Sequence, residues 1–217
     1  MSPFIALEGP EGSGKSTQLR LLQKYLESRG FRVVATREPG GTPVGDQVRA
    51  ILHDPRNVHL SPRAELLLYS ASRAQLVDQV IGPALAAGAI VLCDRYAGST
   101  LAYQGYGRGL DLALLRQLTE FATKGVQPDL VIYLDLPVEV GLRRKILAHE
   151  REGAEWTRMD QQELSFHHRV RAGYLAMAAA EPDRWHIVSA EQNVETVHDE
   201  IRTRVDALLA NRGDVRS

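Results

Sequence analysis

Residues 9–16 read Gly-Pro-Glu-Gly-Ser-Gly-Lys-Ser and match the pattern G-x-x-x-x-G-K-[ST]. Glycines let such a loop curl so that successive backbone N–H groups point at phosphate oxygens. Lys15 would then reach the β- and γ-phosphates of a nucleotide, and Ser16 would bind Mg²⁺. The loop follows an apolar run and opens a segment of helical period, which is the context that this chemistry requires. The residues predicted to bind ATP are Gly9, Pro10, Glu11, Gly12, Ser13, Gly14, Lys15, Ser16 and Thr17.

A carboxylate and a guanidinium, Asp94 and Arg95, follow the third apolar run of the chain. In a parallel sheet the carboxyl ends of neighbouring strands converge, so we expect both side chains beside the phosphate loop. Phosphoryl transfer brings two anions together, and a catalyst must mainly neutralise charge and fix geometry. Arginine suits both tasks because its planar fork holds two phosphate oxygens and stays charged. Taken alone, such a pair is more simply explained as a salt bridge at a strand end.

The elements that would position these groups follow from hydrophobic periodicity. Short apolar runs alternate with longer segments of helical period, a pattern typical of a parallel sheet with crossover helices. Several runs are almost entirely apolar, as strands buried on both faces must be. The predicted strands are Phe4–Leu7, Phe31–Thr36, Ile90–Cys93, Leu130–Leu134 and His186–Val188.

The segments between these runs carry helix signals. Leu19, Leu22 and Leu26 mark one face of a helix that Gly30 is placed to end. A long helix is predicted to begin at Ser61-Pro62 and to reach about Leu85, since serine caps helices and proline suits the first turn. The other predicted helices are Asp111–Ala122, Val138–Leu147, Asp160–Ala179 and Val194–Leu209.

These elements predict an α/β fold of the P-loop NTPase type: a three-layer sandwich with a five-stranded parallel sheet, helices on both faces and a short lid. The 217 residues fit one such domain, which we place at residues 1–210, with a flexible tail at 211–217. Hydrophobic residues at 44% and charged residues at 24% argue against disorder.

Charge and cysteine content exclude several kinds of partner. A formal net charge of -1 gives no broad basic surface, so we expect no nucleic acid partner. The single cysteine, Cys93, cannot form an internal disulfide, and the chain has no Cys/His cluster with metal-ligand spacing. The first residues carry no basic leader and no apolar stretch approaches the ~18 residues of a membrane span. We therefore expect a cytoplasmic protein that does not bind membranes.

A phosphate loop alone is shared by ATPases, GTPases, helicases and kinases of small molecules. A GTPase should carry an Asn/Thr-Lys-x-Asp motif near its fourth strand, where this chain reads Leu130-Val131-Ile132-Tyr133-Leu134-Asp135-Leu136. Motor and helicase ATPases usually add further domains or a nucleic-acid surface, and the sequence shows neither. A small phosphotransferase is the class that remains.

Three motifs make the resemblance to a family specific. Thr36-Arg37-Glu38-Pro39-Gly40-Gly41-Thr42 follows the second strand, Asp94-Arg95-Tyr96 follows the third, and Ala102-Tyr103-Gln104-Gly105 comes soon after. Together they resemble the signature of bacterial-type thymidylate kinases, members of the P-loop nucleoside monophosphate kinase superfamily, over most of the chain. The resemblance implies ATP-dependent phosphorylation of dTMP to dTDP for DNA synthesis, by direct in-line transfer assisted by Mg²⁺. It also implies that Asp94 lies near Mg²⁺, partly through water, and that Arg95 holds the acceptor phosphate.

The acceptor base would be read by Tyr69 and Arg73, which lie four residues apart on one face of the predicted long helix. Spacing alone favours a core aromatic residue and a solvated charge. The resemblance implies instead that the ring stacks on thymine and the arginine hydrogen-bonds the base edge. The family usually has phenylalanine here, and the Tyr69 hydroxyl needs a partner or water.

The resemblance extends the acceptor site to several polar residues. Thr100 and Gln104 would contact the pyrimidine, although capping and turn chemistry explain them equally well from spacing alone. Tyr103 would crowd the 2′ side of the sugar and so favour deoxyribose. Glu11 corresponds to an acidic residue that meets the 3′-hydroxyl or a magnesium-bound water. Acceptor-binding roles are further implied for Glu38, Pro39 and Arg49.

The phosphate loop contains no basic residue besides its lysine, so another segment must supply an arginine to the transition state. The stretch from Leu142 to Asp160 is rich in cations, contains a glycine and resembles the lid of bacterial family members, which we place at about residues 143–158. Lid closure would exclude water from the site. The candidate arginines are Arg143, Arg151 and Arg158, but a solvated helix with ion pairs explains some of these charges equally well.

Two further expectations complete the sequence-based prediction. The face formed by Leu66, Tyr69, Leu76 and Val80 is expected to be partly exposed, and the resemblance implies a homodimer through helices of this region. Two alternative functions stay open: a kinase of another nucleoside monophosphate or small molecule, and a regulatory nucleotide-binding protein without transferase activity. The second would be expected to lack Asp94 or the acceptor-binding residues, and both are present.

Overall fold

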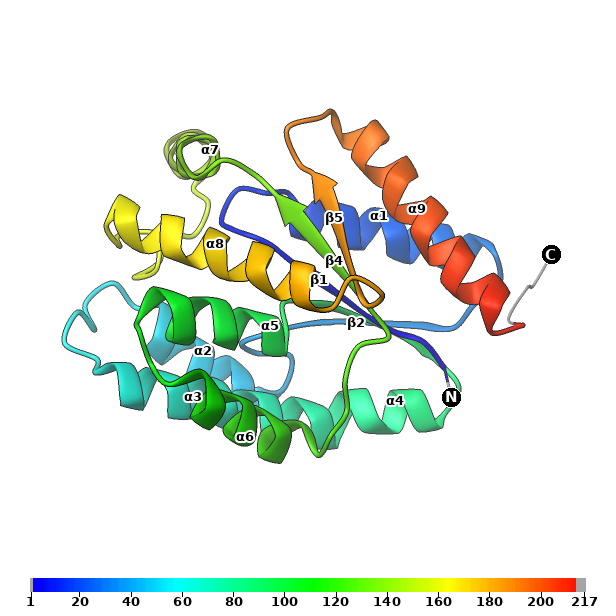
Figure 1. The fold of residues 1–217 in the computed structure, drawn as a ribbon, viewed down its shortest axis with the longest axis horizontal. Helices are drawn as coiled ribbons and strands as arrows, with labels where there is room; N and C mark the ends of the chain where they lie inside the picture. Colours follow the sequence, from blue (N-terminus) through cyan, green and yellow to red (C-terminus); the bar gives the residue numbers. More distant parts are fainter. Residues whose placement is uncertain (1, 214–217) are drawn as a thin grey trace.

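The computed structural model describes residues 2–213, which form a central five-stranded sheet with the strand order β2-β3-β1-β4-β5 (Figure 1). Every neighbouring pair of strands is parallel. The strands are β1 Phe4–Glu8, β2 Val33–Arg37, β3 Ile90–Asp94, β4 Leu130–Asp135 and β5 Trp185–Ser189. The prediction of a parallel α/β sheet is therefore confirmed.

Helices connect the strands and cover both faces of the sheet (Figure 1). The α-helices are α1 Lys15–Ser28, α2 Pro43–His53, α3 Pro62–Leu76, α4 Gly82–Ala86, α5 Ala97–Thr100, α6 Leu112–Thr123, α7 Val138–Glu152, α8 Leu164–Ala180 and α9 Val194–Asn211. Two π-helical segments, η1 Val77–Ile81 and η2 Leu101–Gly107, continue α3 and α5.

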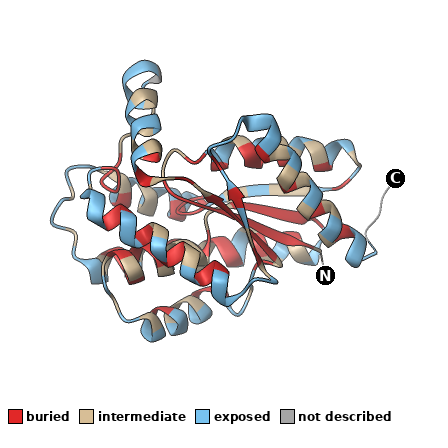
Figure 2. Ribbon diagram, turned by 45° about the horizontal axis from the view of Figure 1, so that its top comes forward, coloured by how far each residue is buried: buried red, intermediate tan, exposed pale blue. Residues whose placement is uncertain are grey.

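Alternation along β1 shows how the three layers form. Ile5 and Leu7 point to one face, where they pack in a cluster with side chains of α1 and α9. Phe4 and Ala6 point to the other face, toward α3, η1 and α4. The part of that second face under α8 is filled by a cluster that includes Tyr133. The three inner strands β1, β3 and β4 are consequently buried, the edge strands β2 and β5 are partly exposed, and the outer surfaces of the helices are exposed (Figure 2).

Several boundaries differ from the sequence-based prediction, and α7 extends to Glu152 instead of ending at Leu147. Phe31 precedes β2 because its backbone N–H donates to Leu26 O at 3.1 Å and so belongs to the end of α1. The helix predicted from Asp160 begins only at Leu164. There the Asp160 carboxylate accepts hydrogen bonds from the backbone N–H and the hydroxyl of Thr157, both at 2.7 Å, which fixes a turn instead of a helix.

The long helix predicted from Ser61 is present, but it changes type along its length. Ser61 caps α3 by accepting a hydrogen bond from the Ala64 N–H at 3.3 Å. The π-helical segment η1 joins α3 to α4, which carries Pro83 in its first turn. Proline has no N–H, so a regular α-helix would lack one hydrogen bond there. The run ends at Ala86, close to the predicted end.

Two helical regions were absent from the sequence-based prediction. Thr42 caps α2 by accepting a hydrogen bond from the Gly45 N–H at 2.9 Å, and Pro43 occupies the first turn. This capping signal is present in the sequence, where Thr42 is also the last residue of the motif that follows the second strand. Residues 97–107 are helical although they include Gly98, Gly105 and Gly107, which lower helix propensity.

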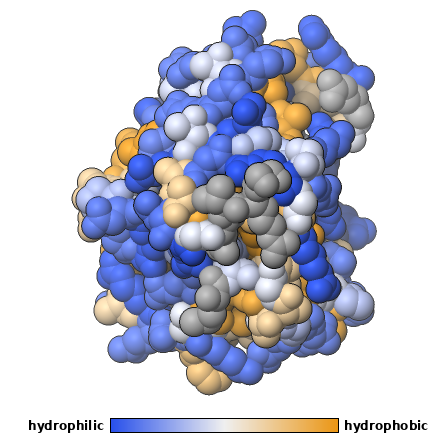
Figure 3. Space-filling view, turned by 90° about the vertical axis from the view of Figure 1, so that its right-hand side faces the viewer, coloured by the Kyte–Doolittle hydropathy of each residue, from blue (hydrophilic) through white to orange (hydrophobic). Residues whose placement is uncertain are grey.

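The exposure of residues on α3 differs in part from the sequence-based prediction. Leu66 and Leu76 belong to the core, with exposed fractions of 3% and 0%, so the predicted partly exposed face of α3 is wrong at these positions. Among the large apolar residues of α3, Leu67 is the exposed one, with an exposed fraction of 58%. The face that carries the chain ends is mainly hydrophilic, with hydrophobic residues in small separate areas (Figure 3).

Of the tail predicted at 211–217, Asn211 is the last residue of α9, and residues 214–217 lie outside the described part. One domain over residues 1–210 stays a prediction. Within residues 2–213, no helix is both long and apolar enough to cross a bilayer.

Candidate active site

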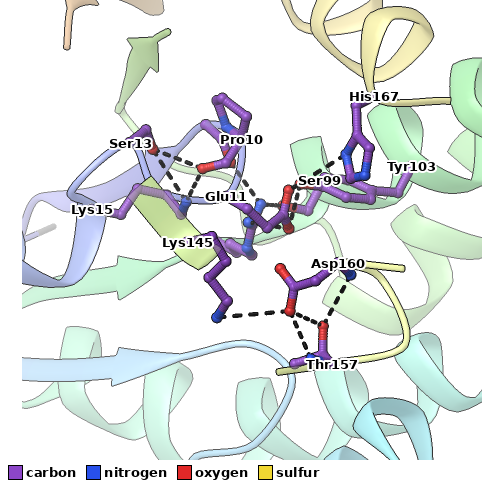
Figure 4. A network of polar contacts seen from close by, with 12 residues as sticks. Pro10, Glu11, Ser13, Lys15, Ser99, Tyr103, Lys145, Thr157, Asp160 and His167 are labelled. Atoms are coloured by element: carbon purple, nitrogen blue, oxygen red, sulfur yellow. Dashed lines mark hydrogen bonds and ion pairs between the residues drawn. The ribbon is translucent and has the colours of Figure 1, made fainter. Parts of the chain in front are cut away.

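The phosphate loop connects the end of β1 to the start of α1. Gly12 and Gly14 have φ values of 72° and 86°, a left-handed conformation that favours glycine. The buried Lys15 folds back over the loop, and its ammonium donates to Pro10 O at 2.7 Å and to Ser13 Oγ at 3.3 Å (Figure 4). The loop therefore has the curled shape that its sequence predicts, with the lysine positioned at its mouth.

The charge of Lys15 is only partly compensated by its surroundings. Burial lowers the pKa of its ammonium to about 8, and the nearby guanidinium of Arg95 acts in the same direction. Asp94, Glu11 and Glu8 act in the opposite direction, since their carboxylates favour the charged lysine. An anion placed in the loop would supply the missing compensation.

Ser16 and Asp94 bring two oxygen ligands together. The hydroxyl of Ser16 donates to Asp94 Oδ2 at 2.6 Å, although the residues are 78 positions apart in sequence. The parallel sheet creates this contact, because Asp94 at the end of β3 is in register with Leu7 of β1, just before the loop. A hydroxyl and a carboxylate at the mouth of a phosphate loop form a small site of hard oxygen ligands.

Arg95 adopts a conformation that is uncommon for a residue with a side chain. Its φ is 67°, and its guanidinium donates to Gly9 O at 2.8 Å and to Glu11 Oε1 at 3.0 Å. Non-glycine residues with positive φ persist only where the surroundings hold them. Two features hold Arg95 beside the loop. One is the set of hydrogen bonds from its guanidinium, and the other is the hydrogen-bonded turn formed by the residues that follow it.

The carboxylate of Glu8 stabilises the turn that follows Arg95. It accepts hydrogen bonds from the N–H groups of Tyr96 at 2.9 Å and Ser99 at 3.1 Å, and from the Ser99 hydroxyl at 2.6 Å. Burial raises the pKa of Glu8, while these donors act in the opposite direction. The predicted strand ended one residue earlier, at Leu7, so this positioning residue was missed.

Glu11 joins the phosphate loop to the helical segment η2. The hydroxyl of Tyr103 donates to both carboxylate oxygens of Glu11 at 2.8 Å, and the ring of Tyr103 lies 5.1 Å from the Arg95 guanidinium. His167 Nδ1 lies 4.0 Å from Glu11 Oε2 (Figure 4). Burial opposes the charge of Glu11, but Arg95 and Lys15 lower its pKa, so the carboxylate is ionised at neutral pH.

A second buried network surrounds Arg73 of α3. Its guanidinium contacts Glu38 Oε2, with Nη2 at 2.6 Å and Nε at 2.8 Å. It also donates to Thr100 Oγ1 at 2.9 Å and to Tyr96 O at 3.1 Å. Burial raises the pKa of Glu38, and Arg73 acts in the opposite direction. Arg73 is therefore neither a solvated surface charge nor a free side chain, but a fixed member of the site.

Glu65 lies at the centre of a third network, behind Gln104. The fully buried carboxylate accepts hydrogen bonds from Gln104 Nε2 at 2.7 Å, Arg108 Nη2 at 3.1 Å and Arg158 Nη2 at 2.5 Å. This network fixes the Gln104 amide, whose carbonyl oxygen is not used in the contact with Glu65. It also binds Arg158, one of the three candidate lid arginines, through the Glu65 carboxylate.

The segment after α7 contacts α2 through Glu155. The carboxylate pairs with Arg49 Nη2 at 2.7 Å and with His53 Nδ1 at 2.9 Å. Arg49 also donates to Pro39 O at 3.3 Å. The side chain of Glu155 is 52% exposed, so this contact lies at the surface and closes one side of the site.

Many of these groups, though not Glu8, Glu65, Arg108, Arg158 or His167, line one cavity of about 650 Å³. The phosphate loop lies at one end, and side chains of α2, α3 and η2 form the other end. The predicted site residues that line it are Glu11, Gly12, Gly14, Lys15, Ser16, Thr17, Glu38, Pro39, Arg49, Tyr69, Arg73, Asp94, Arg95, Thr100, Tyr103 and Gln104. Asp94 and Arg95 lie between the two ends, where two phosphate-bearing ligands would meet.

A larger cavity of about 1070 Å³ lies between α6, the loop 124–128 and α8. It contains none of the residues of the phosphate loop, and its floor is mainly apolar, with Leu101, Met177 and Trp185. Size therefore does not identify the active site. The smaller cavity is the candidate because it combines the loop, the paired oxygen ligands and the buried arginines.

Residues 7–201 match the sequence model of the family described as "Thymidylate kinase". This chain belongs to the thymidylate kinase family. A thymidylate kinase of Roseiflexus sp. is 50% identical over 222 residues, which cover 97% of this chain and 96% of that protein. A thymidylate kinase of Syntrophotalea carbinolica is 53% identical over 201 residues, which cover 91% of this chain and 92% of that protein.

The fold agrees with a solved structure of the family. The crystal structure of thymidylate kinase from Ehrlichia chaffeensis superposes with a TM-score of 0.75 at 34% sequence identity, covering 94% of this chain and 98% of that one. The resemblance proposed from three short motifs thus holds for nearly the whole chain.

Within this thymidylate kinase fold, six predicted site residues do not line the cavity. Gly9, Pro10 and Ser13 form the back of the phosphate loop, and Pro10 O and Ser13 Oγ contact Lys15. Arg143 and Arg151 are exposed, and Arg158 is buried against Glu65. The structure therefore brings together the predicted donor and acceptor residues, but not the three lid arginines.

Several residues of the site were absent from the sequence-based prediction. They include cavity-lining residues of the lid segment and partners that hold the site from behind. Their sequence signals were weak, because charged residues at helix surfaces are usually solvated. The missed residues are Glu8, His53, Glu65, Arg108, Lys145, Glu155, Thr157, Asp160 and His167.

Proposed function

We propose that this chain transfers the terminal phosphate of ATP to dTMP and forms ADP and dTDP. The observation that carries the proposal is the cavity in which the phosphate loop and the network of Arg73 and Gln104 face each other across Asp94 and Arg95. The family to which the chain belongs, thymidylate kinase, phosphorylates this acceptor. The donor end would hold ATP, because the P-loop supplies inward N–H groups, the N-terminus of α1 and Lys15.

The residues present fit a magnesium ion at the mouth of the loop. Ser16 Oγ and Asp94 Oδ2 lie 2.6 Å apart, so both oxygens can face one cation or one of its bound waters. Mg²⁺ prefers oxygen ligands and usually takes one or two from the protein and the others from water and substrate phosphates. No cluster of three or more metal-ligating residues occurs in the described chain, and such a site does not need one. The ion would neutralise charge on the ATP phosphates.

The acceptor end suits a pyrimidine deoxynucleotide. We propose that the Tyr69 ring stacks on the base, while Gln104, Thr100 and Arg73 read or frame its polar edge. We propose that Tyr103, whose hydroxyl donates to Glu11 Oε1 at 2.8 Å, crowds the 2′ side of the sugar. A substrate with an additional 2′-hydroxyl would disturb this buried contact.

The two phosphates would meet beside Arg95. We propose that Arg95, with Arg49 as a second cation, holds the acceptor phosphate in line with the γ-phosphate, which Lys15 binds from the donor side. The reaction is then a direct displacement, in which an acceptor phosphate oxygen forms a bond to the γ-phosphorus and ADP leaves. No enzyme nucleophile is required, because charge neutralisation and alignment supply the catalysis.

We further propose a cytoplasmic homodimer. Leu67 of α3 and Leu114 and Phe121 of α6 have exposed fractions of 58%, 50% and 84%, and these two helices pack against each other. Exposed apolar residues on adjacent helices are typical of a surface that another chain covers. The free, buried thiol of Cys93 agrees with a reducing compartment.

The experiment that tests the function is a panel of nucleoside monophosphates with ATP and Mg²⁺, measured by ADP release. We expect dTMP to give the highest kcat/KM, with uridylate, cytidylate and the ribose form of thymidylate at least about tenfold lower. A Lys15→Ala variant controls for contaminating kinases and should lose turnover with every acceptor. Preference for another monophosphate would contradict the acceptor assignment, and ATP binding without turnover would favour a regulatory protein.

A further inference from the structure

The first turn of α7 lies directly against the phosphate loop. A Cβ atom on Gly141 would be 2.5 Å from Glu11 O, and one on Gly12 would be 2.3 Å from Gly141 O. Neither distance leaves room for a side chain, so glycine is needed on both sides of the contact. Helix α7 is therefore fixed relative to the loop at its N-terminal end.

This contact decides which side chains of α7 face the active site. Residues four and seven positions after Gly141 lie on the same face of the helix. These residues are Lys145 and Ala148, and both line the cavity. Arg143, two positions after Gly141, lies on the opposite side and is exposed. Arg144 donates to Ala190 O at 2.9 Å, away from the cavity.

The ammonium of Lys145 is directed by Asp160. Lys145 Nζ lies 3.7 Å from Asp160 Oδ2, which also accepts hydrogen bonds from the backbone N–H and the hydroxyl of Thr157. The other oxygen, Asp160 Oδ1, is buried and has no hydrogen-bond partner within the described residues. In Figure 4, the Lys145 side chain points toward the Asp160 carboxylate. Its side chain keeps 22% exposure and remains available to a ligand.

We propose that Lys145 is the catalytic cation that the lid helix supplies to the γ-phosphate, and that Asp160 is its positioning residue. This inference rests on the proposed phosphoryl transfer. As the bond from the γ-phosphorus to the bridging oxygen breaks and the bond to the acceptor oxygen forms, negative charge builds on groups that Lys15 contacts from one side only. Lys145, which lines the same cavity, offsets that charge as a second cation. The ammonium neither gives nor takes a proton, so the step balances without a further reactant.

The arrangement of the three arginines in the lid segment supports this choice. Arg158 has an exposed fraction of 3% and is paired with Glu65 behind the acceptor pocket. Arg143 and Arg151 are exposed and do not line the cavity. The composition of the segment does not distinguish its lysine from its arginines, but the spacing of Lys145 from Gly141 places it on the face toward the cavity.

The test is the steady-state kinetics of Lys145→Ala. We expect kcat to fall by about 10²- to 10³-fold, as for the loss of one transition-state donor, with much smaller changes in KM for ATP and dTMP. Lys145→Arg should recover most of the lost kcat, because it keeps the charge. The matched control is Lys24→Ala, which removes an exposed lysine of α1 and should leave kcat unchanged. Denaturation midpoints of all variants show whether a loss of rate reflects loss of folding.

A role for Asp160 is tested separately with Asp160→Asn. If the carboxylate only stabilises the turn at Thr157, this variant should lower the denaturation midpoint and leave kcat of the folded protein unaltered. If it positions Lys145, kcat should fall even where the protein is fully folded. In an Asp160→Asn, Lys145→Ala double variant the two losses should then not multiply.

Two outcomes would overturn the proposal. One is a kcat for Lys145→Ala within a few-fold of wild type. The other is a large loss of kcat in Arg143→Ala or Arg151→Ala that exceeds the loss in Lys145→Ala. Turnover of dTMP by the wild-type protein is measured first. If the wild type does not turn over dTMP, the proposed function is contradicted. If it does and Lys145→Ala turns over dTMP equally well, only this inference is contradicted.

Discussion

At the scale of single residues, the site contains buried charges that bound phosphates would help to balance. Lys15 is the clearest case, because burial and the neighbouring Arg95 lower its pKa to about 8. The ammonium must be protonated to bind phosphate. It is protonated below this pKa and neutral above it, so the free enzyme should lose affinity for ATP as the pH rises through 8.

The first prediction concerns this pH dependence. kcat/KM for ATP should fall about tenfold for each pH unit above about 8, since it reports the free enzyme. kcat should persist to higher pH, because bound phosphates favour the charged lysine and raise its pKa. Lys15→Arg is the control, since arginine stays charged and any residual activity should not decline over this range. A wild-type kcat/KM that is level throughout the alkaline range would contradict the assignment.

A second residue-scale prediction concerns Glu155, which holds Arg49 in the absence of substrate. An acceptor phosphate would have to compete with this carboxylate for the guanidinium. Glu155→Gln should therefore lower KM for dTMP by up to about fivefold, the equivalent of an exposed ion pair of ~0.2–1 kcal/mol. The effect should weaken with added salt, and a rise in KM would show that Glu155 assists binding instead.

At the scale of elements, the fold holds together segments that are far apart in the sequence. Glu65 of α3 binds Gln104 and Arg108, in and next to η2, and Arg158 of the lid segment. Two of these partners are cations that would lose their buried counter-charge without it. The network thus fixes the acceptor pocket and one end of the lid segment at the same time.

The prediction at this scale is that Glu65→Ala lowers the free energy of unfolding by about 3–5 kcal/mol, the usual cost of breaking a buried ion pair. Urea denaturation measures the loss, and Glu120→Ala, which removes an exposed carboxylate of α6, should have little effect. A loss below about 1 kcal/mol would show that water replaces the carboxylate.

At the scale of the whole molecule, the sheet places the site and the helices define the outer surface. The site lies beyond the carboxyl ends of β1 and β3, on the side where α7 stands (Figure 1). The exposed apolar residues of α3 and α6 lie on a different surface. Assembly through that surface would leave the cavity open to substrates.

The prediction at this scale concerns assembly. Phe121→Asp should convert a dimer to a monomer at micromolar concentration in size-exclusion chromatography with light scattering, because a charge would be buried in an apolar contact. The control is Val194→Asp, which changes an exposed apolar residue at the start of α9. If wild type is already a monomer, or if both variants stay dimeric, the surface is not the interface.

The sequence by itself determined the fold class and most of the site. Short apolar runs that alternate with segments of helical period predicted β1 and β3 as inner strands. The glycine pattern of residues 9–16 predicted the curled phosphate loop. The parallel arrangement then made the contact between Ser16 and Asp94 foreseeable, because carboxyl ends of parallel strands meet at one edge.

Only the tertiary structure decided which charges of the lid segment line the cavity and which are exposed or buried elsewhere. Arg143, Lys145 and Arg158 lie in one basic segment, and nothing local separates an exposed cation from a buried or a cavity-facing one. Contact with other elements separates them: α7 meets the phosphate loop at Gly141, and Glu65 holds Arg158. Direction and burial depend on partners distant in sequence, which is why the prediction named the lid segment but not its lysine.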